Sequence, residues 1–184
     1  LYIAPDSIRG DTEAFERFIE ENGITIAILP PQFLRQLNLK GMRTVITAGS
    51  ETSKDIVEAN KHIPVYSNDY GPTEATVCAT FWKHNAEEPV PERIPIGRPM
   101  NNKQIYVMNG MELCGIGVQG ELCIAGEGIA RGYLNRPELT TEKFIDNPFG
   151  EGKLYRSGDL ARWLPDGNIE YLGRIDEQVK IRGF

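Results

Sequence analysis

The chain opens with a segment whose apolar residues recur at helical spacing. Phe15, Phe18 and Ile19 fall on one side of a helix over residues 11–23, acidic residues stand early in it, and Gly23 closes it. This pattern predicts an amphipathic helix that packs one face on a core.

The next stretch alternates between strand-like and helix-like patterns. Strands are expected at residues 24–31, 43–51 and 63–69, and short helices at residues 32–37 and 53–62. The first of these strands is almost continuously apolar, which favours a buried strand. Strands that alternate with helices predict βαβ units and a mainly parallel sheet.

The ends of the three expected strands carry turn-forming and polar residues. They read "LPP", "TAGSE" and "NDYGPTE" in chain order. In open α/β sheets, ligands bind beyond the carboxyl ends of the strands. These three loops are therefore expected to surround one site.

The second half of the chain has a different pattern. Residues 85–102 are rich in proline and polar residues and read as a connecting segment, and residues 103–175 hold short β runs separated by Gly, Asn and Asp. We expect a β hairpin around "PDGN" at residues 165–168 and one short helix at residues 136–144. The predicted fold class is α/β: part of a mainly parallel α/β sheet subdomain in residues 1–84, followed by a small antiparallel β-barrel-like subdomain.

Composition narrows the functional classes. The chain has 184 residues, 40% of them hydrophobic and 25% charged, which suits one ordinary globular domain or two small ones. A net charge of −6 argues against a nucleic-acid partner. Three cysteines and two histidines without metal-ligand spacing argue against zinc and disulfides and fit a reducing cytoplasm. The sequence has no apolar run long enough to span a membrane, and its ends suggest an excerpt of a longer protein.

The segment "NDYGPTEATVCATFW", residues 68–82, raises the first chemical question. A Gly-Pro turn precedes Thr73 and Glu74, and β-branched and aromatic residues follow them over residues 76–82. The pair fits a helix N-cap with a first-turn acid. It fits equally a hydroxyl and a carboxylate beside a phosphate-bound Mg²⁺. A following strand would favour the second interpretation.

Three further motifs are ambiguous when each is taken alone. In "GEGIARG" the glycine spacing departs from a dinucleotide fingerprint, so turn glycines with positive φ are expected. Asp159, in "YRSGDLARW" at a Gly-rich turn between two strands, either caps its own backbone or grips a ribose diol. The charged run from Arg174 to Arg182 is either a solvated face or a set of phosphate contacts.

Taken together and in order, these motifs resemble a known family. "NDYGPTE", "GELCIAGEGIARGYLNRPELT" and "YRSGDLARWLPDGNIEYLGRIDEQVKIRGF" are similar to motifs of the adenylation domains of nonribosomal peptide synthetases. These domains belong to the adenylate-forming superfamily. The resemblance covers essentially the whole chain. It implies activation of an amino acid with ATP to an aminoacyl-adenylate, and then transfer to the phosphopantetheine thiol of a carrier protein.

The resemblance assigns expected roles around the nucleotide base and the phosphates. Tyr70 should stack on the adenine. Thr73 should contact the α-phosphate, and Glu74 should hold Mg²⁺. The residues expected to line the edge of the adenine are Asn68, Asp69, Gly49, Ser50 and Glu51.

The resemblance also assigns roles near the end of the chain. Asp159 should bind the ribose hydroxyls, with Tyr171 and Arg174 nearby on the nucleotide. Asp176 matches the hinge of the family's C-terminal domain, whose first part would be residues 176–184. The family's phosphate loop and its amine-binding aspartate should precede residue 1, and its catalytic lysine should follow residue 184. We therefore expect little activity from this chain alone.

The resemblance places a substrate pocket at the strand ends. Its expected wall is Ile28, Ile46, Ala48, Asp69, Val77 and Cys78. Because a carboxylate in an apolar pocket is costly unless paired, Asp69 predicts a side chain that carries a donor or a cation on an apolar or aromatic body. Alternatively, Asp69 turns away and the pocket takes an unsubstituted aromatic residue.

Two other functional classes remain open at this stage. One is an acyl-CoA synthetase or another carrier-protein ligase of the same superfamily. The other is a non-catalytic module that binds nucleotide or a carrier protein. In the main interpretation the partners are the amino acid, the carrier protein and neighbouring synthetase domains, with no nucleic acid and no membrane.

Overall fold

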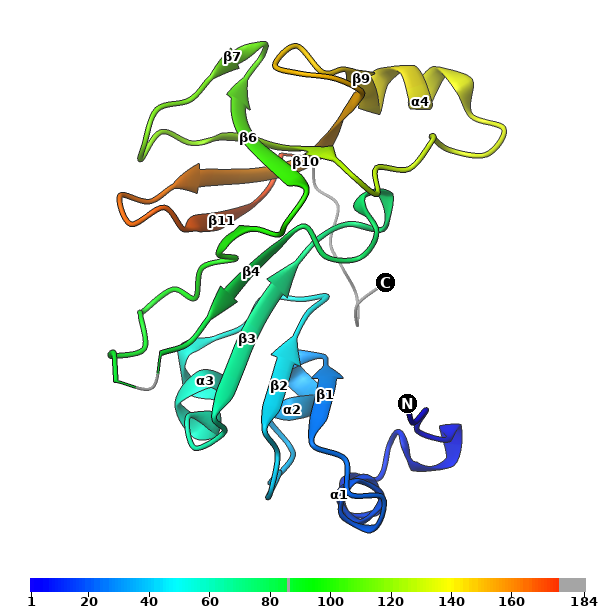
Figure 1. Ribbon diagram of the computed structural model, residues 1–184, viewed down its shortest axis with the longest axis vertical. Helices are drawn as coiled ribbons and strands as arrows, with labels where there is room; N and C mark the ends of the chain where they lie inside the picture. The colour runs from blue at the N-terminus through cyan, green and yellow to red at the C-terminus, as the bar shows by residue number, and fades with distance from the viewer. Residues whose placement is uncertain (86, 176–184) are drawn as a thin grey trace. The chain divides into compact units, whose positions relative to one another are not determined.

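The computed structural model describes residues 1–85 and 87–175, and these form two compact units (Figure 1). The first unit contains residues 1–68 and 83–94, except the undescribed residue 86. The second contains residues 69–82 and 95–175. The boundaries expected from the sequence, near residues 84 and 103, stay a prediction. The structure groups residues 69–82 with the β-rich half because Ala75 and Ala79 belong to its hydrophobic core and Tyr70 packs against that core.

The first unit begins with the helical segment that the sequence predicts. After a short 3₁₀ helix, η1 (Asp6–Ile8), helix α1 (Thr12–Glu21) starts at Asp11, whose side chain accepts a hydrogen bond from the Ala14 N–H at 3.0 Å. This N-cap satisfies one of the free donors at the helix start. Phe15 and Ile19 are buried, as the spacing requires.

Parallel strands form the centre of the first unit. Strands β1 (Ile26–Leu29), β2 (Thr44–Thr47) and β3 (Val65–Tyr70) pair in parallel with β2 between the others, and α2 (Pro31–Leu34) and α3 (Lys54–Asn60) lie between them in the chain. This confirms the predicted mainly parallel α/β sheet. The predicted burial of the first strand is wrong for one face, since Ile26 and Ile28 are 51% and 68% exposed. They share that face because side chains alternate along a strand.

The second unit is dominated by an antiparallel sheet. Its strand order is β11-β10-β8-β6-β7, with β9 paired to β10. The bounds are β6 (Lys103–Asn109), β7 (Glu112–Leu113), β8 (Gly120–Gly126), β9 (Phe144–Asp146), β10 (Lys153–Trp163) and β11 (Ile169–Arg174). The antiparallel pairing of β10 with β11 confirms the hairpin predicted around "PDGN".

Shorter elements complete the second unit. Helix α4 (Pro137–Lys143) confirms the predicted short helix, with Pro137 at its start. A two-residue strand, β5 (Arg98–Pro99), pairs antiparallel with β4 (Thr80–Lys83). Among the helices that the structure describes, none is long and apolar enough to cross a membrane.

The structure corrects one predicted strand. Residues 76–82 were expected to be extended, but β4 begins only at Thr80, and a 3₁₀ helix, η2 (Thr73–Ala75), precedes it. Thr76 and Val77 adopt positive φ values of 58° and 66°. Their β-branched character predicted a strand, yet the packing of this loop overrides that preference. In contrast, the predicted positive φ in "GEGIARG" is confirmed for its three glycines.

Candidate functional site

Asp159 lies at an irregularity inside one long strand rather than at a turn between two strands, which corrects the sequence-based placement. Arg156 pairs with Cys123 of β8, and Leu160 pairs with Glu121. Between these two pairs the chain advances four residues along β10 but only two along β8. Residues 157–159 therefore bulge out of the pairing of β10 with β8. Such bulges re-aim side chains and are frequent next to active sites.

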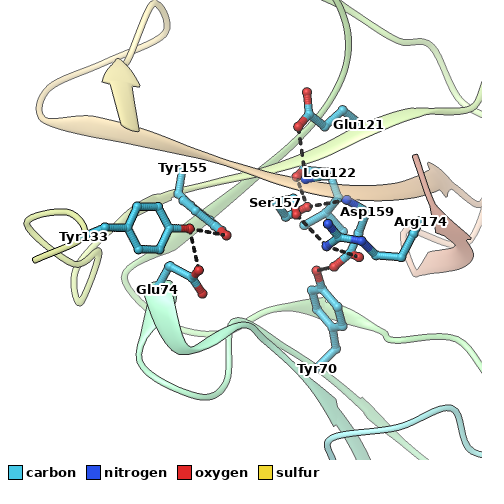
Figure 2. Close-up of polar contacts among 10 residues, drawn as sticks. Tyr70, Glu74, Glu121, Leu122, Tyr133, Tyr155, Ser157, Asp159 and Arg174 are labelled. Carbon is cyan, nitrogen blue, oxygen red and sulfur yellow. Dashed lines mark hydrogen bonds and ion pairs between the residues drawn. The ribbon is translucent and has the colours of Figure 1, made fainter. Parts of the chain in front are cut away.

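The bulge presents a buried carboxylate to two polar partners. Asp159 is 3% exposed, accepts a hydrogen bond from the Tyr70 hydroxyl, and lies 3.1 Å from Arg174 Nη1 (Figure 2). Arg174 Nη1 also donates to the Ser157 carbonyl at 2.8 Å. A buried charge needs such pairing to be tolerated.

Tyr70 is an aromatic residue held beside this carboxylate. Its ring centroid lies 6.1 Å from that of Tyr171. Burial, and secondly the negative charge of Asp159, raise the pKa of Tyr70 well above its usual value. The Tyr70 hydroxyl is therefore a neutral donor at physiological pH. The structure thus brings together Tyr70, Asp159, Tyr171 and Arg174, four residues that the sequence assigned to the nucleotide.

Glu74 belongs to a second polar cluster of the same unit. Its Oε1 accepts a 2.6 Å hydrogen bond from the Tyr133 hydroxyl, and the Tyr155 hydroxyl lies 3.4 Å from that of Tyr133. Figure 2 shows Tyr155 and Asp159 on the same side of β10, each reaching toward one of the two clusters. Burial is the main cause that raises the pKa of both Tyr133 and Tyr155, so both hydroxyls are neutral at pH 7.

The backbone of η2 is fixed by residues from distant segments. The Glu74 carbonyl accepts from the Ala130 N–H at 2.8 Å, and the Ala75 carbonyl accepts from Lys103 Nζ at 2.9 Å. The Thr76 hydroxyl donates to the Gly128 carbonyl at 2.6 Å. Thr73, at the start of this turn, is exposed. The turn is therefore held by hydrogen bonds within the protein itself.

Gly71 allows the chain to fold back on itself after Tyr70. A Cβ atom at Gly71 would lie 2.5 Å from the Val77 carbonyl oxygen and 2.7 Å from the Ala79 nitrogen. The Ala79 N–H donates to the Tyr70 carbonyl at 2.7 Å. The returning backbone, with its two β-branched residues at positive φ, is the kind of local strain that clusters at functional sites.

The first unit holds four of the five residues predicted at the adenine edge, and the fifth, Asp69, belongs to the second unit. Asn68 is buried, and its Oδ1 accepts from Thr52 Oγ1 at 2.9 Å and from Thr47 Oγ1 at 3.3 Å. These bonds anchor the end of β3 to both sides of the Gly49-Ser50-Glu51 loop, which is exposed. Asn68 and this loop therefore share one hydrogen-bonded region, and their contact with a base stays a prediction.

The predicted pocket residues divide between the two units. In the first, the parallel register places Ile28 beside Ile46, and Ala48 follows just after β2 ends. In the second, Val77 is exposed, while burial and then the charge of Asp69 raise the pKa of the half-buried Cys78. Asp69 and Cys78 therefore lie within electrostatic reach of each other. A 440 Å³ cavity in the first unit contains none of the predicted pocket residues in its lining, which includes Glu16, Glu20 and Lys40.

Several functional candidates were missed by the sequence reasoning. They are Tyr133, Tyr155, Glu121, Ser157 and Lys103. Tyr133 and Glu121 lie in the motif "GELCIAGEGIARGYLNRPELT". Their presence in a motif shared with the family was the available signal that they could matter for function. Asp176, predicted as the hinge, lies outside the described residues. Among the described residues, no group of three His, Cys, Asp or Glu side chains could hold a metal ion.

With this geometry in view, comparison with known proteins defines the class. The AMP-binding enzyme family matches residues 1–134, and the chain belongs to that family. The resemblance to adenylation domains of nonribosomal peptide synthetases is likewise confirmed, because the similar proteins are synthetases of this kind.

Individual relatives show how much of such proteins the chain represents. It is 52% identical to tyrocidine synthase 2 of Brevibacillus parabrevis and 52% identical to gramicidin S synthase 1 of Brevibacillus brevis, in each case over the whole chain. It spans only 5% and 17% of those two proteins.

The solved structures that match this chain also contain adenylation domains, and the chain again covers only part of each. The holo-PA1221 structure, an NRPS protein containing adenylation and PCP domains bound to a vinylsulfonamide inhibitor, matches 94% of this chain with a TM-score of 0.87 and 28% identity. This chain covers 32% of it. The artificially fused adenylation-PCP di-domain NpsA-ThdA from Klebsiella oxytoca matches 95% of the chain with a TM-score of 0.82 and 29% identity, and 34% of that protein is covered.

Proposed function

We propose that this chain forms the nucleotide-binding part of an adenylation domain that activates an amino acid for nonribosomal peptide synthesis. The observation that carries the proposal is the buried Asp159 carboxylate at the β10 bulge, with Tyr70, Tyr171 and Arg174 around it. In this proposal Asp159 accepts hydrogen bonds from the two ribose hydroxyls, and the Tyr70 ring stacks on the adenine, with Asn68, Asp69 and the Gly49–Glu51 backbone at its edge.

The first half-reaction joins the amino acid to AMP. A carboxylate oxygen of the amino acid attacks the α-phosphorus of ATP, the bond between the α- and β-phosphates breaks, and pyrophosphate leaves with the bonding electron pair. Thr73 would donate its hydroxyl hydrogen bond to the α-phosphate. Arg174 would add positive charge near the nucleotide, which favours the developing negative charge.

Glu74 is the residue proposed to hold Mg²⁺. The available donors, a carboxylate and the neighbouring Thr73 hydroxyl, are hard oxygen ligands of the type Mg²⁺ prefers. A single protein carboxylate suits this ion, because it usually keeps several waters and binds substrate phosphates as well. When bound, Mg²⁺ would neutralise charge on the phosphates.

The second half-reaction transfers the aminoacyl group. The phosphopantetheine thiolate of a carrier protein attacks the carbonyl carbon, a thioester forms, and AMP leaves. The adenylation-PCP architecture of the matched structures supports a carrier protein as partner. Neighbouring synthetase domains would supply it.

The experiment that tests the proposal is amino-acid-dependent ATP–pyrophosphate exchange by the complete protein that carries this chain. We expect exchange with one class of side chain and none without an amino acid, and the Asp159→Asn variant should lower it at least tenfold. Exchange that requires a carboxylic acid lacking the α-amino group would instead identify another ligase of the superfamily. Nucleotide binding without exchange for any acid would identify a binding module.

Asp69 is the residue proposed to read the side chain of the substrate. After burial, the negative charge of Asp69 contributes to the raised pKa of Cys78, another predicted pocket residue, and this supports the proposal. We expect Asp69→Ala to reduce exchange with a histidine-like, indole, phenol or amine side chain and to leave smaller apolar side chains less affected. An unchanged order of preference would refute the assignment. Ranking all common amino acids with both proteins measures this.

A further inference from the structure

On the side that faces β8, the bulge that carries Asp159 is held by side chains in place of the strand ladder. The Gly158 N–H donates to Glu121 Oε1 at 3.1 Å, and the Asp159 N–H donates to Ser157 Oγ at 3.0 Å. Ser157 Oγ in turn donates to the Leu122 carbonyl at 2.5 Å. Two consecutive N–H groups at the bulge are therefore bound by side chains, as buried backbone groups require.

The two carboxylate oxygens of Glu121 accept hydrogen bonds from different partners. Oε1 accepts from Gly158, while Oε2 accepts from Arg156 Nε at 2.9 Å and Nη2 at 2.6 Å. The hydrogen bond to Glu121 is the main cause that raises the pKa of Arg156. Glu121 is buried, whereas the Arg156 side chain is 39% exposed. Arg156 thus compensates the buried charge, and the other oxygen is directed at the Ser157–Gly158 peptide, one residue before Asp159.

We propose that Glu121 is a positioning residue for Asp159: by accepting the Gly158 N–H it fixes the peptide that aims the Asp159 carboxylate at Tyr70, Arg174 and the ribose of the nucleotide. Figure 2 shows Glu121 reaching the bulge from β8, on the opposite side of β10 from Tyr70. This inference rests on the proposed role of Asp159 toward the ribose. The Gly158 N–H is joined to Asp159 through the backbone of Gly158, and this is the route by which the Glu121 contact acts on the Asp159 carboxylate.

A second buried ion pair, between β10 and β11, provides a matched control. Glu170 of β11 is 6% exposed and pairs with Arg162 at 2.6 Å, and the Arg162 side chain is 41% exposed. The pair of Glu121 with Arg156 has the same 2.6 Å separation and similar exposure. The two pairs differ in place, since Arg162 and Glu170 are directly paired residues beyond the bulge. A general loss of sheet stability should therefore appear with both glutamates, and a loss of ribose recognition only with Glu121.

Two mild substitutions separate the acceptor role from the ion pair. Glu121→Asp keeps the negative charge beside Arg156 but shortens the side chain by one methylene, which withdraws the acceptor from Gly158. Glu121→Gln removes the charge but keeps a carbonyl that can accept from Gly158, while Arg156 can turn to solvent. Glu170→Asp and Glu170→Gln are the corresponding controls.

The experiment measures equilibrium binding of ATP, 2′-deoxy-ATP and 3′-deoxy-ATP to the complete protein, with thermal unfolding of every variant. The wild type should bind ATP more tightly than either deoxy analogue. Glu121→Asp should reduce that preference roughly tenfold, the order expected when a hydrogen bond to a charged group is misplaced. Glu121→Gln and both Glu170 variants should keep it within about twofold.

The outcomes distinguish this inference from the proposed function. If Glu121→Gln lost the preference and Glu121→Asp kept it, the ion pair rather than the acceptor would matter, and the inference would be wrong. Equal losses in the Glu121 and Glu170 variants would also overturn it. A wild type that bound ATP and both analogues equally would refute the ribose role of Asp159 itself.

Discussion

At the scale of single residues, the Tyr133 hydroxyl is the contact that orients Glu74. Because Glu74 is proposed to hold Mg²⁺, we predict that Tyr133→Phe weakens the Mg²⁺ affinity of the ATP complex about tenfold, the low end of what the loss of a hydrogen-bond partner of a metal ligand costs. The physical reason is that Glu74 loses its 2.6 Å hydrogen bond and its carboxylate can rotate. Titrating Mg²⁺ at fixed ATP and following nucleotide binding measures this effect.

Tyr106→Phe is the matched control for that prediction. It removes the same hydroxyl from another tyrosine of the antiparallel sheet, one that donates to Gln104 at 3.3 Å. Its Mg²⁺ titration should overlay the wild type. Identical curves for Tyr133→Phe and Tyr106→Phe would mean that Tyr133 does not influence the metal.

The residues that sequence reasoning found and missed differ in a physical way. Tyr70, Glu74 and Asp159 stand in compact motifs whose residue types suggest chemistry locally. Their supporting partners are distant: Glu74 and Tyr133 are 59 residues apart, and Glu121 and Gly158 are 37 apart. Such pairs depend on strand register and on the bulge, which residue patterns do not specify.

At the scale of elements, the loop after β3 has an unusual backbone, because Thr76 and Val77 adopt positive φ values. We predict that Gly71→Ala destabilises the protein by about 1–3 kcal/mol, the usual cost of overpacking. Its Cβ would meet backbone atoms of Val77, Cys78 and Ala79 at 2.5–2.8 Å, and backbone cannot turn aside as a flexible side chain can. ATP binding should also weaken, because Tyr70 is the adjacent residue.

Gly115→Ala is the control for Gly71→Ala. Among the described residues outside its chain neighbours, no heavy atom lies within 4 Å of a Cβ placed there, and the position is exposed. Its free energy of unfolding should stay within about 0.5 kcal/mol of wild type. Chemical denaturation of both variants measures the difference, and similar values for the two would contradict the role given to Gly71.

Most helices and strands could be predicted because the spacing of their hydrophobic residues matches the faces that are buried in the structure. The parallel strands, α1, α4 and the β10–β11 hairpin follow this rule. Residues 76–79 do not, since β-branched residues that favour a strand are turned into positive φ by the close return on Gly71. Strand preference reflects the packing surroundings more than the backbone itself, so a local pattern could not reveal this exception.

At the scale of the whole molecule, the residues that the sequence assigns to the nucleotide belong partly to one compact unit and partly to the other. Asn68 and the Gly49–Glu51 loop belong to the first, whereas Tyr70, Glu74 and Asp159 belong to the second. The unit boundary falls between Asn68 and Asp69, within β3. The motif "NDYGPTE" therefore has residues in both units, and the boundary expected near residue 84 stays a prediction.

The exposed face of β1 leads to a prediction about solution behaviour. Ile26 and Ile28 are exposed on a strand that lies at the end of the strand order among the described residues. Apolar side chains on an edge strand favour association between molecules.

We predict that Ile26→Thr lowers self-association of the 184-residue chain, measured by light scattering across a concentration series, and leaves its unfolding midpoint nearly unchanged. Ile116→Thr alters a more exposed isoleucine, 67% against 51% for Ile26, that lies outside the described strands, and it should change scattering less. Equal effects of both substitutions would show that exposed apolar area alone, rather than the strand edge, controls association.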